Sequence, residues 1–424
     1  MDEFSQRGGA LYCEDVPLAG IAEAVGTPAF VYSAASMRSQ ARLLGDALPA
    51  EQDPLIAFAV KANPNRAVLA TLAAEGLGAD VVSGGEYLRA RLAGVPGERI
   101  VFSGVGKTPD EMKLALEGGL FQFNLESFDE AETLSAVAQA MGVHAPASFR
   151  VNPDVAAGTH AKISTGGAHD KFGISPAELL DAFARADSLP GIDLKGIAVH
   201  IGSQLTDLAP LEAAFRKVGE LIGTLREAGH RITVADLGGG LGVAYDPGAP
   251  VPPSAAAYGA MVGRVTREWD VRLVFEPGRL LVGNAGVLLT RVIRVKPGPS
   301  RPFVVVDAAM NDLMRPTLYD AWHGIEAVGP VGDTMVADIV GPVCESGDTF
   351  AKARTIDRVE AGELMVIRSA GAYAATMGSN YNSRTFPAEV LVDGDRWAIV
   401  RERQPFEALV ANERLPAWLE AAAE

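Results

Sequence analysis

Cysteine, positive charge and long apolar runs are all scarce in this sequence, and each shortage excludes a class of protein. The two cysteines, Cys13 and Cys344, are too few for a disulfide framework and form no metal-ligand spacing. Thirty-seven Lys and Arg residues face 53 Asp and Glu residues, which gives a net charge of −16. Because nucleic acids and anionic membranes bind clustered basic residues, neither is expected as a partner. No apolar run reaches the roughly 18 residues of a membrane-spanning helix, so no span of a bilayer is expected.

The remaining composition is that of a globular protein. Apolar residues make up 48% of the 424 residues and charged residues 21%, and the length suggests two or three domains. Residues 1–10 are acidic and polar where a signal peptide needs an apolar stretch, so we expect a cytoplasmic protein. The six histidines show no HExxH or similar spacing, and we predict no metal site.

Short apolar runs alternate with helical stretches, such as residues 64–75 and 211–228, through the first two thirds of the chain. The predicted strands are residues 56–61, 79–83, 100–104, 120–125, 148–152, 196–202, 232–238 and 272–276. Strands that are apolar on both faces are typical of parallel sheets, and eight strand–helix units in sequence fit a TIM barrel, (β/α)₈. The predicted barrel domain covers residues 30–280.

After residue 277 the pattern changes to strands joined by loops, which indicates a second, β-rich domain of sandwich or barrel type. Its predicted strands are residues 287–295, 303–307, 336–342, 363–369, 388–392 and 397–402. This domain is predicted to combine residues 1–29 and 281–424. The candidate strand at residues 29–32 precedes the barrel, and the sequence does not decide which sheet it joins.

Polar residues gather where the predicted barrel strands end, and TIM barrels carry their active sites at the C-terminal ends of the strands. These residues are Lys61, Ser83, Ser103, Asn124, Asn152, His200, Ser203, Gly238, Gly239, Gly240, Glu276 and Arg279. A scaffold built only for stability has no reason to place a lysine, a histidine, a glutamate and a glycine triplet there. We therefore predict the active site at this end.

Two of these features each have two readings. Lys61 ends an apolar strand, and it is either a Schiff-base lysine that loses its charge when partly buried or a lysine that extends to the barrel rim. Gly238-Gly239-Gly240-Leu241-Gly242 follows the seventh strand, where barrel enzymes often bind phosphate, although a tight turn also uses glycine. The spacing fits neither the P-loop nor the GxGxxG dinucleotide motif.

Three further residues are equally open when considered singly. Glu276 could hold the pyridine nitrogen of a cofactor protonated, or form a local ion pair with Arg279. His200 is flanked by apolar residues, as core histidines often are, but Ser203 lies just beyond it at a strand end. Cys344 follows an apolar run, as inert buried cysteines do, and a role as proton donor needs exposure and a tuned pKa.

The segments together resemble the fold-type III pyridoxal-phosphate-dependent decarboxylases, and within them the diaminopimelate decarboxylases. The matches run in the expected order from about Phe30 to Pro387. They are Phe58-Ala59-Val60-Lys61-Ala62-Asn63, Val82-Ser83-Gly84-Gly85-Glu86, His200-Ile201-Gly202-Ser203-Gln204, residues 238–242, residues 276–279, Met310-Asn311-Asp312-Leu313-Met314-Arg315-Pro316-Thr317-Leu318-Tyr319, residues 344–348 and Gly371-Ala372-Tyr373. Any one match is modest, whereas the ordered set is specific.

The resemblance implies a pyridoxal 5′-phosphate site. Lys61 would form the Schiff base with the cofactor, and His200 would stack on the pyridine ring. Glu276 would contact the ring nitrogen, and Tyr373 would complete the phosphate site near the substrate. The other cofactor-binding residues implied are Ser203, Gly238, Gly239, Gly240, Pro277, Gly278 and Arg279.

The resemblance also implies the reaction, decarboxylation of meso-2,6-diaminopimelate to L-lysine and carbon dioxide, the last step of lysine biosynthesis. Arg279, Arg315 and Tyr319 would bind a substrate carboxylate, with Tyr373 nearby, and Glu345 would bind the distal ammonium. Cys344 would be the proton donor after carbon dioxide leaves. In this family Cys344 and Glu345 come from the neighbouring subunit, so a homodimer with shared active sites is expected. A guanidinium pairs with a carboxylate in bidentate fashion, and two of them select against lysine, which lacks that group.

Three alternatives remain. A decarboxylase of ornithine, arginine or lysine would share the cofactor residues but differ in the substrate segment. An isomerase resembling alanine racemase would place an arginine, in the position of Glu276, on the ring nitrogen. A regulatory relative without activity would have lost Lys61 or Cys344. One departure from the family is Asp170, where serine is commoner, in a segment at residues 158–173 that is expected to form a mobile lid rather than a plain connection because of its length.

Overall fold

The computed structural model describes residues 3–155 and 171–420, which form two compact units. The first, the barrel unit, contains residues 33–286 and 368–376. The second unit contains residues 4–32, 287–367 and 377–424. Each unit is described by itself.

Eight parallel strands close the barrel, in the order β10-β11-β12-β5-β6-β7-β8-β9. They are β5 (Leu55–Ala59), β6 (Gly78–Val81), β7 (Ile100–Phe102), β8 (Gln122–Leu125), β9 (Ala145–Arg150), β10 (Ile192–Ala198), β11 (Val234–Asp236) and β12 (Arg272–Phe275). Each overlaps one of the eight runs predicted from the sequence, so the predicted barrel is confirmed.

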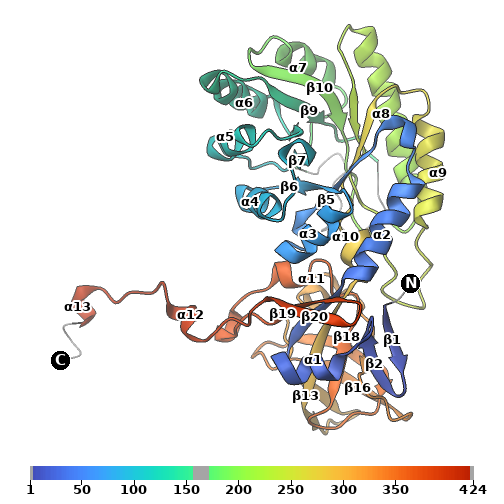
Figure 1. Ribbon diagram of the computed structural model, residues 1–424, viewed down its shortest axis with the longest axis vertical. Coiled ribbons are helices and arrows are strands. Elements are labelled where there is room, and N and C mark those ends of the chain that lie inside the picture. The colour runs from blue at the N-terminus through green and yellow to red at the C-terminus, as the bar shows by residue number, and fades with distance from the viewer. Residues whose placement is uncertain (1–2, 156–170, 421–424) are drawn as a thin grey trace. The chain divides into compact units, whose positions relative to one another are not determined.

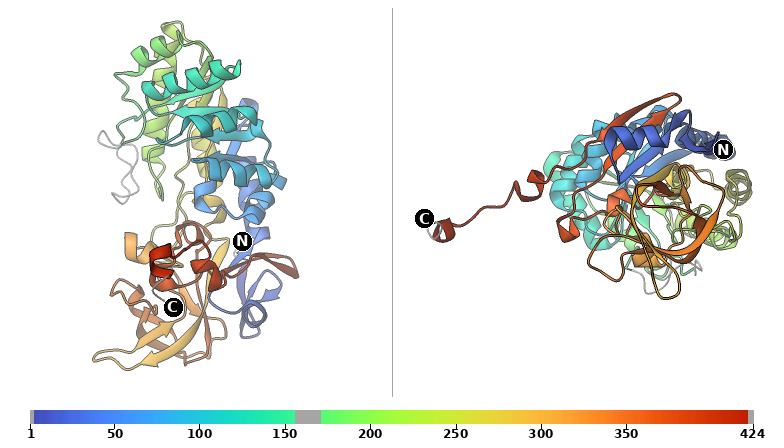
Figure 2. Two further views of the ribbon diagram at one scale, coloured as in Figure 1. Left: turned by 90° about the vertical axis from the view of Figure 1, so that its left-hand side faces the viewer. Right: turned by 90° about the horizontal axis from the view of Figure 1, so that it is seen from below.

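Helices lie on the outside of the barrel strands (Figures 1 and 2). They are α2 (Ala34–Ala47), α3 (Arg66–Ala74), α4 (Gly84–Leu92), α5 (Pro109–Glu117), α6 (Phe128–Met141), α7 (Leu179–Ala186), α8 (Ala209–Glu227), α9 (Ala255–Thr266) and the short α10 (Arg279–Val282). Several begin at a side-chain cap that satisfies a free backbone N–H, such as Ser83 before α4, Ser127 before α6 and Ser254 before α9. Thr108 and Glu111 form a full capping box at α5. These caps fix where each strand-to-helix loop ends, and therefore the rim on which the site is built.

The interior of the barrel carries both apolar and polar side chains. One cluster of fully apolar residues is made by Leu55, Ala57, Val101, Val234 and Val274. Other inward positions carry buried polar side chains that bond to one another: Ser148 Oγ donates to Gln122 Oε1 (3.1 Å) and Gln122 Nε2 donates to Asn124 Oδ1 (2.9 Å). The polar column leads to the C-terminal ends of the strands, where the site lies.

The second unit is built from a three-stranded sheet and a nine-stranded sheet. The first sheet consists of β1 (Phe4–Arg7), β2 (Ala10–Cys13) and β3 (Val16–Pro17). The second runs β17-β16-β14-β13-β4-β19-β20, with β15 and β18 paired off this path. Its strands are β4 (Ala29–Ser33), β13 (Gly286–Lys296), β14 (Phe303–Val306), β15 (Ile325–Ala327), β16 (Thr334–Val340), β17 (Thr349–Asp357), β18 (Leu364–Ile367), β19 (Ala388–Asp393) and β20 (Arg396–Arg401). The candidate strand at residues 29–32 thus belongs to this sheet as β4, and not to the barrel.

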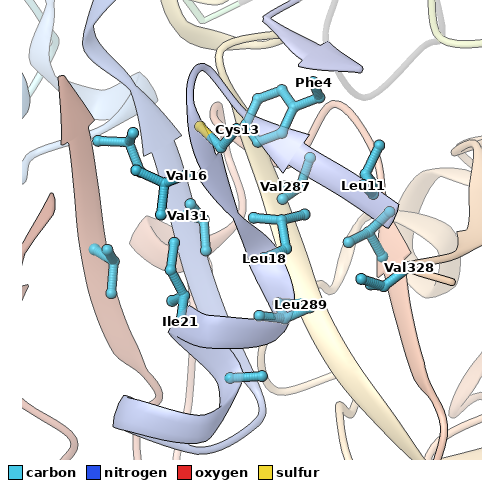
Figure 3. Packing of buried hydrophobic residues seen from close by; sticks show 14 residues of the cluster. Phe4, Leu11, Cys13, Val16, Leu18, Ile21, Val31, Val287, Leu289 and Val328 are labelled. Carbon is cyan, nitrogen blue, oxygen red and sulfur yellow. The ribbon is translucent and has the colours of Figure 1, made fainter. Parts of the chain in front are cut away.

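A single apolar cluster holds the two sheets of the second unit together (Figure 3). Phe4, Leu11 and Cys13 from the small sheet and Leu18 and Ile21 from helix α1 (Leu18–Val25) pack against residues of the large sheet. Cys13 is a buried, free cysteine and acts here as a small apolar side chain.

Three short helices complete the second unit: α11 (Arg315–Tyr319), α12 (Glu407–Val410) and α13 (Ala417–Glu420). The last two lie on an extended C-terminal segment (Figure 2), whose large apolar side chains are exposed. They are Phe406, Val410, Leu415, Trp418 and Leu419. Among the described helices, none combines the length and the apolar character that crossing a membrane needs.

Candidate active site

A cavity of about 380 Å³ lies at the C-terminal ends of the barrel strands. Its lining includes Lys61, Ser103, Asn124, His200 and Glu276, which come from five different strand ends that the sequence had singled out. The structure thus brings these residues together around one space. In the described parts of the chain no three His, Cys, Asp or Glu side chains form a group suited to a metal ion.

Lys61 lies two residues beyond β5, in the short 3₁₀ helix Val60–Ala62, rather than in the strand itself as predicted. Its Nζ bonds to Oδ2 of Asp80, at 2.8 Å, and Asp80 on β6 is fully buried. Burial opposes the charged form of Lys61, but the carboxylates of Asp80 and Glu276 outweigh it and raise the pKa of the ammonium above its ordinary value. The Lys61 ammonium is therefore held at the cavity by a buried acid, while 38% of its side chain stays exposed.

A network of polar side chains surrounds Glu276, which follows β12. Its Oε1 accepts hydrogen bonds from Ser103 Oγ (3.1 Å) and from Asn124 Nδ2 (3.2 Å). The same amide nitrogen donates to Asp236 Oδ2 (2.8 Å) at the end of β11. Burial first, and then the charges of Asp236 and Asp80, raise the pKa of Glu276 well above its ordinary value. Glu276 does not pair with Arg279, so the local ion pair considered from the sequence is absent.

His200 follows β10 and is a neutral imidazole in this environment. Burial, together with the positive charges of Arg150 and Lys61, lowers its pKa well below the ordinary value. Its Nδ1 accepts the backbone N–H of Gly239 at 3.1 Å, which places the ring hydrogen on Nε2 and fixes the ring plane. A flat, uncharged ring held in one orientation can stack on an aromatic ligand.

The glycine triplet after β11 forms a tight turn, and its backbone packs too closely against neighbouring atoms to leave room for a side chain. A Cβ on Gly238 would lie 2.4 Å from the carbonyl oxygen of Val199, and one on Gly239 would lie 2.2 Å from another carbonyl oxygen. Gly238 N–H donates to Asp236 Oδ1 (3.0 Å), while Gly239 N–H donates to His200 Nδ1. The amides of Gly238 and Gly239 thus donate to side chains of the protein itself, and a phosphate contact of the glycine turn stays a prediction.

Arg279 contacts two further candidates, Ser203 and Tyr373, and a tyrosine that was not predicted, Tyr245. Its Nη2 donates to Ser203 Oγ (3.2 Å), its Nη1 donates to Tyr245 Oη (2.5 Å), and its guanidinium lies over the ring of Tyr373, 4.7 Å from the centroid. Tyr373 has a positive φ of 54°, and its N–H donates to the carbonyl of Ala62 (2.8 Å), beside Lys61.

The segment between Glu276 and Arg279 packs closely against this group. A Cβ on Gly278 would lie 3.2 Å from Tyr373 Oη, so glycine permits the close approach. Pro277 accepts the N–H of Ala59 through its carbonyl oxygen (3.0 Å), which ties the segment to the end of β5.

Four predicted residues, Arg315, Tyr319, Cys344 and Glu345, belong to the second unit. Arg315 and Tyr319 begin and end α11, while Cys344 and Glu345 are exposed in a turn after β16. Thr317 Oγ1 donates to the carbonyl of Gly347 (2.7 Å), which joins α11 to that turn.

Asp348 fixes the shape of the turn that carries Cys344 and Glu345. Asp348 accepts the backbone N–H groups of Met310 and Val343, both at 2.7 Å. Cys344 is exposed, so the exposure that a proton donor needs is present, and the reading as an inert buried thiol is excluded.

The predicted lid at residues 158–173 lies mostly outside the described residues, as does Asp170. Its described end is anchored: Gly173 N–H donates to Glu126 Oε2 (2.7 Å), and Glu126 Oε1 accepts from Arg150 Nη1 (3.0 Å). Phe172 lines the cavity and stacks under the Arg150 guanidinium, 4.6 Å away.

Sequence reasoning missed Asp80 and Asp236 as site residues. Each is a single acid within an otherwise apolar strand, and a charge in such a place is costly unless it is paired or has a function. That signal was available in Ala79-Asp80-Val81 and in Val234-Ala235-Asp236-Leu237.

The geometry fits pyridoxal 5′-phosphate, since an amine, a stacking ring and a buried carboxyl group surround one cavity. Residues 34–283 match the family model described as "Pyridoxal-dependent decarboxylase, pyridoxal binding domain". Because the match covers more than half of the chain, the protein is of the pyridoxal-dependent decarboxylase class, and its cofactor is pyridoxal phosphate.

Full-length relatives narrow the class. The chain is 55% identical to a diaminopimelate decarboxylase of Zymomonas mobilis over 421 residues, which cover 99% of this chain and 100% of the relative. It is 49% identical to one of Pseudomonas fluorescens, covering 98% and 99%. The crystal structure of diaminopimelate decarboxylase from M. jannaschii in complex with L-lysine has a TM-score of 0.94 at 35% identity and 99% coverage of both chains. The chain belongs to the diaminopimelate decarboxylase family.

Proposed function

We propose that this protein decarboxylates meso-2,6-diaminopimelate to L-lysine and carbon dioxide, the last step of lysine biosynthesis. One observation carries the proposal: the Lys61 ammonium and the Glu276 carboxyl group line the same buried cavity, in a chain whose full-length relatives bear this activity in their names. An amine and an acid in one cavity are what pyridoxal phosphate needs at its aldehyde and at its ring nitrogen.

The barrel residues bind and orient the cofactor in this proposal. When bound, the pyridine ring supplies an electron sink for the carbanion that decarboxylation leaves. Lys61 holds the cofactor covalently, His200 packs its neutral ring against the pyridine, and Glu276 keeps the ring nitrogen protonated. Gly240 and Ser203 hold the phosphate.

The remaining predicted cofactor residues shape the same pocket. Tyr373 completes the phosphate site, while Pro277 and Gly278 keep the backbone close to the ring. Gly238 and Gly239 position Asp236 and His200, as their hydrogen bonds indicate.

The substrate brings a second amino-acid end, which survives the reaction and has to be recognised. We assign its carboxylate to Arg279, Arg315 and Tyr319, beside Tyr373, and its ammonium to Glu345. Two guanidinium groups favour a substrate with this carboxylate over lysine, since a buried charge without its partner costs on the order of a few kcal/mol. The short helix that carries Arg315 and Tyr319 supports this grouping.

Cys344 is proposed as the proton donor to the carbanion, in a homodimer whose partner subunit supplies it together with Glu345. The exposure of Cys344 supports the role, because a donor to a neighbouring active site has to lie at the surface. Exposed apolar side chains such as Phe406 and Trp418, which are 73% and 77% exposed, support association with a second copy. The excess of acidic residues supports a protein that binds neither nucleic acid nor a membrane, and two free cysteines suit a cytoplasmic protein.

The experiment measures carbon dioxide release by the purified, cofactor-loaded protein with meso-diaminopimelate, lysine, ornithine and arginine in parallel. Turnover of meso-diaminopimelate alone, abolished in Lys61→Ala, is the expected result. Turnover of a basic amino acid would overturn the substrate assignment, and no turnover of any of the four would overturn the activity.

Shared sites are tested by mixing two inactive variants, Lys61→Ala and Cys344→Ala. In a dimer that exchanges subunits, the mixture contains sites with both native residues and regains part of the activity. A mixture that stays inactive although mass measurements show mixed dimers would refute shared sites.

A further inference from the structure

Two buried carboxyl groups at the site share one amide. Asn124 Nδ2, on β8, lies 2.8 Å from Asp236 Oδ2 and 3.2 Å from Glu276 Oε1, while the two acids end the neighbouring strands β11 and β12. Asp236 is 1% exposed and Glu276 8%. The neutral donors Asn124, Ser103 and Gly238 bring hydrogen bonds but no positive charge to compensate two buried negative charges.

The charged and titratable groups around this pair leave it short of positive charge. Lys61 is the nearest cation, but its Nζ is bonded to Asp80. His200 is neutral, and Tyr258, whose pKa is raised by burial and by the charge of Asp236, keeps its proton.

The pair therefore holds a proton. Burial raises the pKa of both acids, and the charge of Asp236 adds to the effect at Glu276. Two carboxyl groups this close titrate as one unit that releases its first proton more readily than its second.

We propose that Asp236 is a positioning residue for the ring nitrogen of pyridoxal phosphate: its negative charge, held beside Glu276 by the shared amide of Asn124, adds to the negative potential that keeps that nitrogen protonated. The inference rests on the proposed contact between Glu276 and the ring nitrogen. When the cofactor binds, the proton that the two acids hold would pass to the ring nitrogen, so that pyridinium and carboxylate would form together and no other reactant would be needed. Asp236 then remains the second negative charge behind the pyridinium.

A purely structural role for Asp236 predicts something different. Its Oδ1 accepts the N–H of Gly238 (3.0 Å) and so stiffens the glycine turn. Asp236→Asn keeps an oxygen for Gly238 but removes the charge. The two roles therefore separate when a cofactor without a basic ring nitrogen is used as the probe.

The test compares binding of pyridoxal phosphate with binding of 1-deazapyridoxal phosphate, in which a C–H replaces the ring nitrogen, to the cofactor-free full-length protein. Neighbouring charges shift a pKa by about 1 to 3 units, and each unit is tenfold in an equilibrium. Asp236→Asn is expected to weaken pyridoxal phosphate at least about tenfold and to leave the deaza analogue at its wild-type affinity. Equal weakening of both ligands, or weakening of neither, would overturn the proposal.

Glu276→Gln is the control for the assumption on which the inference rests. If Glu276→Gln weakens the two ligands equally, the contact between Glu276 and the ring nitrogen is wrong. If Glu276→Gln discriminates between them and Asp236→Asn does not, the contact stands and only the role of Asp236 is refuted.

Ring-nitrogen chemical shifts of ¹⁵N-labelled cofactor give a readout that does not depend on affinity. The ring nitrogen is expected to lose its proton about 1 to 3 pH units lower in Asp236→Asn than in the native protein. Ser103→Ala removes a hydrogen bond to the Glu276 carboxylate, which raises the basicity of that group, so the shift has the opposite sign. Should Asp236→Asn fail to fold, Asn124→Leu removes the shared amide and leaves both carboxylates without that donor, so that the ring nitrogen keeps its proton to a higher pH. An unchanged titration there would overturn the proposal.

Discussion

A lysine buried at the rim of the barrel should contribute far more stability than a lysine in an exposed ion pair. Lys107 Nζ donates to the carbonyl oxygens of Gly104 (2.7 Å) and Asn124 (2.8 Å) and bonds to Glu130 Oε1 (2.6 Å). The Lys107 side chain is 0% exposed and that of Glu130 is 11% exposed. The three contacts join the loop after β7, which carries Ser103 to the cavity, to Asn124 on β8 and to the first turn of α6.

Replacing Lys107 by Met keeps the aliphatic volume but leaves the Glu130 carboxylate buried without a cation and two carbonyl groups without their donor. Removal of one partner of a buried ion pair costs about 3 to 5 kcal/mol of unfolding free energy. Glu130→Gln in the same chain removes the uncompensated charge, so the double variant should recover a part of that loss.

The matched control is Lys113→Met on α5, whose ion pair with Glu117 spans 3.9 Å and whose side chain is 60% exposed. An exposed pair of this kind stabilises a helix by at most about 0.5 kcal/mol. Unfolding by urea, followed by circular dichroism, measures all four proteins under one condition. Equal losses for Lys107→Met and Lys113→Met would refute the argument from burial.

Three further outcomes are expected. Gly239→Ala should abolish cofactor binding, measured by equilibrium dialysis, because the new Cβ would lie 2.2 Å from a backbone carbonyl oxygen. The control Gly223→Ala places its Cβ in open space on α8. This variant should bind the cofactor normally, and its unfolding free energy should rise by up to about 1 kcal/mol. Burial raises the pKa of Glu86 to about 7, so the folded protein binds this proton more tightly than the unfolded chain. The contribution of Glu86 to the unfolding free energy is complete below about pH 4.5 and is lost as the pH rises to about 7. Glu86→Gln should therefore reduce the slope of unfolding free energy against pH in this range by up to about 1.4 kcal/mol per pH unit. An unchanged slope would contradict the assignment. Asp80→Asn should lower the pKa of the Lys61 ammonium, because the carboxylate that offsets the effect of burial is removed. The reaction of the cofactor-free protein with pyridoxal phosphate should therefore begin at a lower pH than in the native protein. An unchanged pH dependence would exclude Asp80 as the partner of Lys61.

The barrel could be predicted because its strands are buried on both faces, so that each appears in the sequence as a continuous apolar run. The boundary at Lys61 was less accurate: the chain leaves β5 at Ala59 and enters a 3₁₀ turn that the apolar pattern does not distinguish from strand. In the second unit the strand β17 was missed. It lies at the edge of its sheet and carries exposed charged residues such as Lys352, which interrupt the apolar pattern as edge strands commonly do.

Residue types at strand ends were enough to predict five of the side chains that line the cavity, but not how they are paired. The ring orientation of His200 depends on an amide 39 residues away, and the acid that holds Lys61 comes from the next strand. Such pairings follow from the register of the closed barrel, which fixes neighbours across strands and is not encoded in any local pattern.

The distribution of polarity inside the barrel explains why stability and function are opposed in this fold. Apolar residues inside it, such as Val101 and Val274, supply packing. On the neighbouring strands and beside them, the acids Asp80, Asp236 and Glu276 are buried near the Lys61 ammonium, an arrangement that costs free energy whenever more than one acid is ionised. A pyridinium bound beside Glu276 would add the missing positive charge, so the binding of the cofactor should stabilise the barrel beyond the contacts that it makes. For the same reason, substitutions that neutralise Asp236 should stabilise the cofactor-free protein while weakening its hold on the cofactor.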